Sequence, residues 1–270
     1  MLLHGKEARV REAGKPEGQA RGLYAGTGQE VPRQRQGTSL RTEKGPVKTT
    51  GPESEADATQ PPLPDYYATV AEDILAFCGC GGREVWMDLG SGAGGVGLAL
   101  AERVPDGTMV LMDPNAEALA KALGDAERRG LASRVVPVVG AAEKMPLPDA
   151  CIDVVVSRGS FYFWQDRAQG LREVWRVLRP GGRAMIGGGL GTGYPAWARS
   201  EFIRRQRESQ RSKGDEAMRK FREARSPETF RRLAAEADLP RFELVGEGGL
   251  DATDPQSGLG IWLKLRKENV

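Results

Sequence analysis

The sequence predicts a doubly wound α/β fold whose seven-stranded sheet is mainly parallel and ends in an antiparallel C-terminal hairpin. Short apolar runs alternate with segments of helical periodicity from Pro64 onward, which is typical of consecutive βαβ units. A glycine-rich turn follows the first apolar run, at 90–97. The last two apolar runs have no helix between them, so we expect these strands to pair in antiparallel fashion.

Each predicted strand is a short apolar run bounded by turn residues. In chain order the strands are 84–89, 108–112, 134–139, 152–157, 183–186, 242–245 and 261–265. The segment Arg179-Pro180-Gly181-Gly182 precedes the fifth strand, and its composition predicts a turn.

Apolar residues at helical spacing predict the helices. They cover about 65–78, 96–103, 116–123, 165–178, 196–224 and 227–237. Ser226 and Pro227 favour the start of the last helix, because serine caps a helix N-terminus and proline suits the first helical position. We expect the long polar helix before it to break near Gly214.

Residues 1–62 differ in composition from the rest of the chain and are predicted to be a disordered tail. Their apolar residues are sparse, so this stretch buries too little apolar area to offset the entropy lost on ordering. The first fifty residues hold ten Lys and Arg and five Glu. This mild excess of positive charge allows a weak nucleic-acid tether, but a solvated tail is the favoured interpretation. Residues 63–270 are long enough for one α/β domain.

A single histidine, His4, and three cysteines restrict the chemistry of the 270-residue chain. They exclude a Ser-His-Asp triad within the fold, a Cys-His nucleophile pair and a zinc site with two or more histidines. The net charge of +2 gives no general case for binding nucleic acid or a membrane. No apolar run reaches the ~18 residues of a membrane span, and no secretory signal is evident. Three cysteines are too few for a disulfide framework, so we expect a cytoplasmic location.

The glycine-rich turn allows two interpretations. Its spacing, Gly90-x-Gly92-x-x-Gly95, formally satisfies the dinucleotide fingerprint of an NAD(P)-dependent oxidoreductase, with Asp113 at the end of the second strand. Asp88 argues against this, because a carboxylate at the mouth of the strand would repel a pyrophosphate. It suits a cationic ligand such as S-adenosylmethionine, whose amino group and sulfonium can face Asp88 while its ribose hydroxyls donate to Asp113.

Five motifs in order resemble those of the class I S-adenosylmethionine-dependent methyltransferases, and the resemblance covers about 64–270. The motifs are Asp88–Gly94, Val110–Asp113, Gly140–Pro148, Ile152–Ser157 and Leu171–Gly182. The sequence is most similar to the small-molecule branch, such as the quinone-biosynthesis C-methyltransferases. The resemblance implies a Rossmann-like fold, S-adenosyl-L-methionine as cofactor and a small-molecule substrate.

The resemblance also implies a set of cofactor-binding residues. They are Asp88, Gly90, Ser91, Gly92, Gly94, Asp113, Pro114, Ala142, Glu143 and Ser157. One position departs from the family, because many relatives have an acid where this chain has Ala141, and that acid binds the adenine amino group. We expect the backbone N–H of Ala142 to remain available for the adenine ring.

The predicted substrate pocket contains Arg158, Tyr162, Trp164 and Tyr67. Phe161 and Phe163 fit a core position or the pocket equally well. Arg158 either binds an acidic group of the substrate or pairs with a carboxylate of the protein, such as that of Asp166. No catalytic base is assigned. If one is needed, the candidates are Tyr66, Tyr67, Tyr162, Asp166 or a carboxylate of the C-terminal region.

Cys78, Cys80 and Cys151 are the residues that could suggest a metal site. Cys151 precedes the fourth strand, at the end of the sheet opposite the cofactor, so we expect no metal site.

The sequence leaves two alternatives to methylation of a small molecule. Residues 199–225 hold ten Lys and Arg against five acids, which leaves an RNA methyltransferase open. Ser157-Arg158-Gly159-Ser160 stands where enzymes that methylate base amino groups have an Asp/Asn-Pro-Pro-aromatic motif, so nucleic acid is the less favoured partner. A non-catalytic cofactor-binding regulatory protein is the other alternative.

Overall fold

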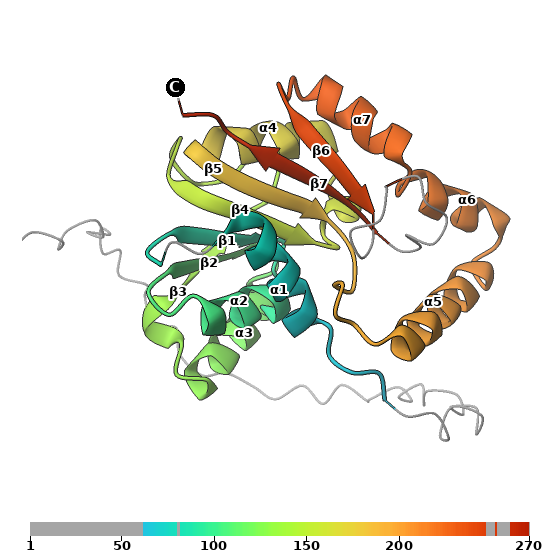
Figure 1. The fold of residues 1–270 in the computed structure, drawn as a ribbon, viewed down its shortest axis with the longest axis horizontal. Helices are drawn as coiled ribbons and strands as arrows, with labels where there is room; N and C mark the ends of the chain where they lie inside the picture. The colour runs from blue at the N-terminus through green and yellow to red at the C-terminus, as the bar shows by residue number, and fades with distance from the viewer. Residues whose placement is uncertain (1–61, 80–81, 247–251, 253–259, 270) are drawn as a thin grey trace, which may run out of the picture. The chain divides into compact units, whose positions relative to one another are not determined.

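The computed structural model describes residues 62–79, 82–246, 252 and 260–269. Within these ranges seven strands form one sheet, in the order β3-β2-β1-β4-β5-β7-β6 (Figure 1). The strands are β1 (Val85–Leu89), β2 (Thr108–Asp113), β3 (Val135–Val139), β4 (Ile152–Arg158), β5 (Leu178–Gly187), β6 (Phe242–Gly246) and β7 (Ile261–Arg266). The predicted fold class is confirmed. The predicted tail, residues 1–62, lies outside the described residues apart from Pro62.

The first five strands are parallel, and the last two run antiparallel to their neighbours. β7 inserts between β5 and β6, so it pairs on both sides while β6 forms the edge of the sheet. The parallel order reverses between β1 and β4, and an open α/β sheet binds its ligands beyond the carboxyl ends of its strands at such a point.

Helices cover both faces of the sheet (Figure 1). One face packs against α1 (Tyr67–Cys78), α2 (Gly95–Arg103) and α3 (Ala116–Arg128), and the other against α4 (Arg167–Val177) and α7 (Pro227–Glu236). Alternate residues of β1 face opposite sides, as strand geometry requires. Trp86 packs toward α1–α3, whereas Met87 and Leu89 pack toward α4 and α7.

The helix boundaries follow the predicted signals. Ser226 accepts a hydrogen bond from the amide of Thr229 at the start of α7. Gly214, with φ of +91°, separates α5 (Ala196–Arg211) from α6 (Asp215–Glu223). None of the described helices is long and apolar enough to cross a membrane.

The predicted turn at 179–182 instead lies within β5. The pairing of β4 with β5 shifts register here, from Ile152 opposite Leu178 to Val154 opposite Arg183. Backbone hydrogen bonds from Gly181 to Lys267 and from Lys267 to Gly182, each of 2.8 Å, extend the sheet through this irregular stretch. The local composition signals a turn, but pairing with a segment distant in the sequence decides the conformation.

Candidate functional site

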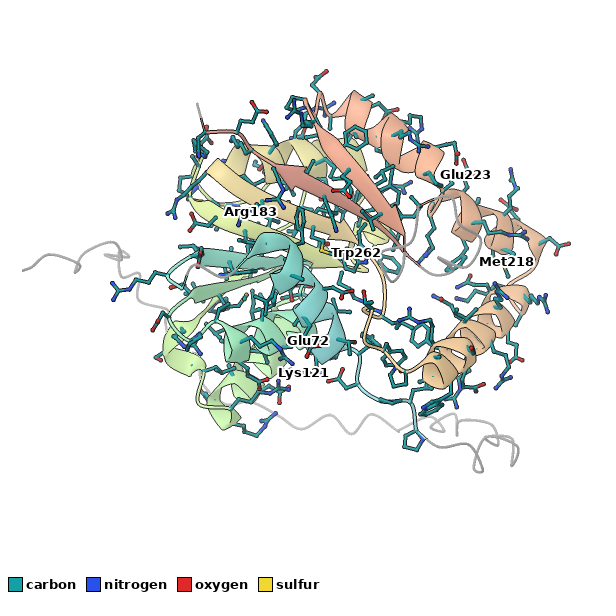
Figure 2. The ribbon with its side chains drawn as sticks, in the orientation of Figure 1. Glu72, Lys121, Arg183, Met218, Glu223 and Trp262 are labelled. Atoms are coloured by element: carbon teal, nitrogen blue, oxygen red, sulfur yellow. The ribbon has the colours of Figure 1, made fainter. Side chains whose placement is uncertain are left out.

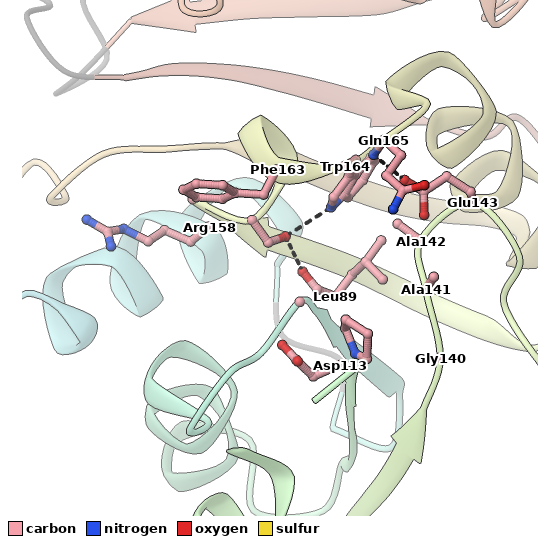
Figure 3. Close-up of a pocket in the computed structure, with 14 residues that line it drawn as sticks. Leu89, Asp113, Gly140, Ala141, Ala142, Glu143, Arg158, Phe163, Trp164 and Gln165 are labelled. Carbon is pink, nitrogen blue, oxygen red and sulfur yellow. Dashed lines mark hydrogen bonds between the residues drawn. The ribbon is translucent and has the colours of Figure 1, made fainter. Parts of the chain in front are cut away.

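Two adjoining cavities lie at the carboxyl ends of the parallel strands. The first cavity, of about 560 Å³, lies among the segments that follow β1, β2, β3 and β4 (Figure 3). The second cavity, of about 330 Å³, lies between the glycine-rich turn and the start of α1. Gly90 and Arg158 line both cavities. Together they form an elongated site at the point where the strand order reverses.

The glycine-rich turn packs closely against the end of β2 and against Ser160, which follows β4. The amides of Gly90 and Ser91 donate to the carbonyl oxygen of Met112, at 2.7 and 3.1 Å. Gly90 has φ of +72°, and a Cβ atom at this position would lie 2.2 Å from the Cβ of Ser160. The turn therefore requires glycine at position 90 for both conformation and space.

Asp113 ends β2 and joins two parts of the site. Its Oδ2 accepts a 2.8 Å hydrogen bond from the amide of Gly92, and its Oδ1 accepts one of the same length from the amide of Asn115. The carboxylate lines the first cavity. A carboxylate has about four acceptor positions, so it can also accept from the hydroxyls of a ribose.

Asp88 lies at the end of β1 under the first turn of α2 and is only 2% exposed. Its Oδ2 accepts a 2.8 Å hydrogen bond from the amide of Gly97, one of the N–H groups that a helix start leaves without an internal partner. Burial raises the pKa of Asp88 from 3.8 to about 7, although the hydrogen bond from Gly97 opposes the shift. Asp88 lines the second cavity, so a cation bound there would stabilise its ionised form.

Tyr67 and Ser91 complete the second cavity. The Tyr67 ring lies directly over Gly95, where a Cβ atom would come within 2.4 Å of the ring. Burial is the main cause that raises the pKa of Tyr67 to about 12, so this phenol is neutral at physiological pH. The Ser91 Oγ is buried and has no hydrogen-bond partner within the described part of the chain. Because buried polar groups are normally hydrogen-bonded, this hydroxyl is a candidate to bind a ligand.

Ser160 lines the first cavity but is not among the cofactor-binding residues that the sequence predicts. Its Oγ donates to the carbonyl oxygen of Leu89 at 2.8 Å and accepts from Trp164 Nε1 at 3.2 Å (Figure 3). The Oγ atoms of Ser157 and Ser160 are 2.6 Å apart. Ser160 lines the first cavity, whereas Ser157 is fully buried behind it. Their spacing, Ser157-x-x-Ser160, is the signal that could have identified the pair.

The loop after β3 supplies another wall of the first cavity. Ala141, Ala142 and Glu143 line it. Glu143 Oε1 accepts from the amides of Gln165 and Asp166, at 2.6 and 3.3 Å. Its carboxylate therefore holds the loop after β4 against the loop after β3.

Eight of the ten predicted cofactor residues line the two cavities; the exceptions are Ser157 and Gly94. Gly94 is the N-cap of α2, with φ of +82°, and a Cβ there would lie 3.0 Å from the Cβ of Ala122. Gly94 therefore lies beneath the glycine-rich turn, where α2 packs close to α3. Pro114, next to Asp113, lines the first cavity.

The four consecutive aromatic residues divide between the core and the cavities. Phe161 is fully buried and Trp164 lines the first cavity, but Phe163, at 84% exposure, also lines that cavity while Tyr162 does not. Residues Phe161–Phe163 form a 3₁₀ helix, so side chains three apart share a face. The rings of Phe161 and Trp164 accordingly lie 5.1 Å apart, centre to centre.

Arg158 lies at the junction of the two cavities, but it does not pair with Asp166. Its Nε donates to the carbonyl oxygen of Gly189 and its Nη1 to the hydroxyl of Tyr66, both at 2.9 Å. Asp166 instead caps α4 by accepting from the amide of Gln169 at 2.9 Å. The suggested pairing is therefore wrong, and Asp166 acts as a helix cap.

Among the described residues, no three His, Cys, Asp or Glu side chains lie close enough together to hold a metal ion. Cys78 is buried in α1, and the Cys151 Sγ donates to the carbonyl oxygen of Pro148. Cys80 lies outside the described residues.

The sheet order, the glycine-rich turn and the acids that end β1 and β2 define a class of protein, the Rossmann-like methyltransferases. Residues 87–186 match the protein family described as a methyltransferase domain. A candidate S-adenosyl-L-methionine-dependent methyltransferase from Methanococcus maripaludis shares 27% identity and a TM-score of 0.60, covering 76% of this chain and 86% of its own. Residues 87–186 therefore match a methyltransferase domain, and the five motifs that resemble the class I S-adenosylmethionine-dependent methyltransferases all lie within this match.

Curated relatives match this part of the chain. The 2-methyl-6-phytyl-1,4-hydroquinone methyltransferase of Spinacia oleracea is 34% identical over 117 residues, which are 43% of this chain and 32% of the relative. The demethylmenaquinone methyltransferase of Thermus thermophilus is 37% identical over 100 residues, 37% of this chain and 44% of the relative. The match thus spans less than half the length of these relatives.

Proposed function

We propose that the protein is an S-adenosylmethionine-dependent methyltransferase that acts on a small-molecule acceptor. One observation supports this most strongly. Asp88 and Asp113, at the ends of adjacent strands, line two adjoining cavities on either side of Gly90. A buried acid suits the cationic methionine end of the cofactor, and an acid with acceptor positions to spare suits its ribose.

The residues present fit the cofactor. Ser91 offers a buried hydroxyl without a partner in the described part of the chain, and the loop at Ala141–Glu143 forms a wall suited to the adenine. When bound, S-adenosylmethionine supplies a methyl carbon on a sulfonium, which a nucleophile attacks as the C–S bond breaks and the electron pair stays on sulfur. The chain's own residues would position the acceptor in line and exclude water.

Two observations narrow the search for a general base. The raised pKa of Tyr67 makes this phenol a poor proton acceptor near neutral pH. Asp166 caps the N-terminus of α4 and lines neither the first nor the second cavity. We infer that placement and desolvation provide most of the rate acceleration, because the sulfonium already activates the methyl group.

The basic segment that left RNA open forms α5 and α6, where several basic side chains pair within the helices. Arg204 pairs with Glu201 and Glu208, and Lys220 pairs with Glu216. Such pairs lower the positive potential available to a phosphate backbone. This observation favours a small molecule over RNA. The cysteine content supports a cytoplasmic location, which cell fractionation would test.

Transfer of labelled methyl groups tests the proposed activity. The purified full chain would be incubated with methyl-labelled S-adenosylmethionine and a deproteinised metabolite extract. Label in a small-molecule product is the expected result. Cofactor binding without label transfer to the metabolites would favour the regulatory alternative, and label in added total RNA would favour the RNA alternative.

A further inference from the structure

A positively charged cavity of about 680 Å³ is lined mostly by residues that follow the segment 87–186, which matches the methyltransferase family. Its wall comes from the aromatic segment after β4 and from α5, α6 and α7. Five of its lining side chains are basic, and one is acidic; they are Arg167, Lys213, Lys220, Arg225, Arg232 and Glu223. Glu223 lies at the end of α6, close to the start of α7 (Figure 2). We call this space the cationic cavity.

The cationic cavity adjoins the proposed active site. Phe163 lines both it and the first cavity. A small cavity of about 110 Å³ lies beside both, sharing Arg158 and Gly159 with the first cavity and Tyr162 and Arg225 with the cationic cavity. A small molecule that occupies the cationic cavity would therefore extend toward Arg158 and the methyl-transfer site.

Arg225 has the geometry of an anion-binding residue. Its guanidinium lies 3.8 Å from the ring centre of Tyr162 and 3.9 Å from that of Phe221. Stacking on ring faces leaves the N–H groups in the guanidinium plane available for a carboxylate or phosphate. Nη1 makes one long bond, 3.4 Å, to the carbonyl oxygen of Phe221, and the buried Nε has no partner in the described part of the chain.

Arg167 provides a second donor in the same cavity. Its Nη1 is buried and, among the described residues, has no hydrogen-bond partner. By contrast, Lys220 and Arg232 pair with Glu216 and Glu236 at 2.7 Å. Burial lowers the pKa of both Arg167 and Arg225, and a bound anion would offset this cost of burying positive charge. Neither arginine forms an ion pair within the described part of the chain, and both carry a buried nitrogen without a hydrogen-bond partner there.

We propose that the methyl acceptor is an anionic small molecule, with a carboxylate or phosphate that binds Arg225 and Arg167 in the cationic cavity. Its apolar body would lie against Phe163 and lead to the first cavity. This inference rests on the proposed function. The acceptor would thus differ from that named for the relative of Spinacia oleracea, a phytyl hydroquinone, and α5–α7, which supply most of the cationic cavity, lie outside the residues 87–186 that match the family.

Calorimetric titration of the full chain, saturated with S-adenosylhomocysteine, tests the proposal. The probes are benzoate, phenyl phosphate and the neutral benzamide, so that the two anions distinguish carboxylate from phosphate. We expect at least one anion to bind, and benzamide to bind at least about ten-fold more weakly. Arg225→Gln and Arg167→Gln should each weaken binding of the anion by about ten-fold or more, whereas Arg222→Gln, an exposed position on α6, should not.

Several results would overturn the proposal: no binding of either anion at millimolar concentration, equal binding of benzamide, or equal losses in Arg225→Gln and Arg222→Gln. If Arg225→Gln does not fold, Arg167→Gln and the salt dependence of binding to the wild-type chain decide the question. Titration with S-adenosylmethionine separates the two hypotheses. If the cofactor binds but the anions do not, only the acceptor inference fails; if the cofactor does not bind, the proposed function fails.

Discussion

The carboxylate of Asp113 accepts a 2.8 Å hydrogen bond from the amide of Gly92 and thereby holds the glycine-rich turn against the end of β2. The same carboxylate lines the first cavity, so one side chain both shapes the site and faces its proposed ligand. This double role means that removal of the carboxylate would affect ligand affinity through direct contact and through the position of the turn.

Asp113→Ala should weaken S-adenosylmethionine binding by about ten-fold or more, roughly 1.4 kcal/mol. The physical reason is the loss of acceptors for the ribose together with loosening of the turn at Gly92. Calorimetric titration measures the effect, and Asp106→Ala, at an exposed turn, is the matched control. Wild-type affinity in Asp113→Ala would refute the assignment.

Asp88 should make cofactor binding depend on pH. Its pKa is about 7, so the carboxyl group is protonated below that pH, and a cationic ligand must then displace a proton. We expect affinity for S-adenosylmethionine to rise as the pH increases through about 7, and to rise less in Asp88→Asn. Comparing the two proteins at each pH cancels titration of the ligand. Parallel pH profiles for the two would contradict the role given to Asp88.

Asp88 should also lower stability as the pH rises. Its folded pKa of about 7 lies above the usual 3.8, so between these values the folded state binds more protons than the unfolded state. The contribution of this group to the free energy of unfolding therefore falls as the pH increases through that window. The window spans roughly pH 4 to 7, so pH 5 lies within it and pH 7.5 just above it. The stability of Asp88→Asn relative to wild type should therefore be greater at pH 7.5 than at pH 5. Urea unfolding at both pH values measures this, and a constant difference would disprove it.

Ser160→Ala should destabilise the protein by about 1–3 kcal/mol, because the Nε1 of Trp164 and the carbonyl of Leu89 lose their hydrogen-bond partner. Urea unfolding provides the measurement, with the exposed Ser200→Ala as control. Equal stability of the two variants would show that the Ser160 hydroxyl is dispensable.

Gly90→Ala should disrupt the site through a collision with Ser160, since the added Cβ would lie 2.2 Å from the Cβ of that residue. The double variant Gly90→Ala with Ser160→Gly removes the collision but keeps the positive φ at position 90. We therefore expect partial recovery of cofactor affinity, measured as a double-mutant cycle. Strictly additive losses would indicate that the two residues do not interact.

Local sequence patterns were sufficient to predict the sheet. Apolar runs and turn residues placed each strand to within a few residues, and the glycine-rich turn located Asp88 and Asp113 together because the ends of adjacent parallel strands meet at one edge. The extension of β5 through 179–182 was not predictable, because it depends on hydrogen bonds to Lys267.

The finer features of the site depended on conformations and contacts that local patterns do not encode. The local pattern left Phe161 and Phe163 open between the core and the pocket, and the 3₁₀ helix of this segment buries Phe161 while Phe163 lines the first cavity. Arg225 stacks on Tyr162, which lies far away in the sequence, so no short motif indicates this contact. Asp166 looked available to Arg158, but its position made it the N-cap of α4.

Calorimetric titration of the full chain with S-adenosylmethionine, alongside NAD⁺ and NADH, tests the central claim most directly. The account predicts saturable binding of S-adenosylmethionine at one site, weakened in Asp113→Ala, and no measurable binding of either dinucleotide. Tight binding of NAD⁺ or NADH by a protein that does not bind S-adenosylmethionine would contradict it.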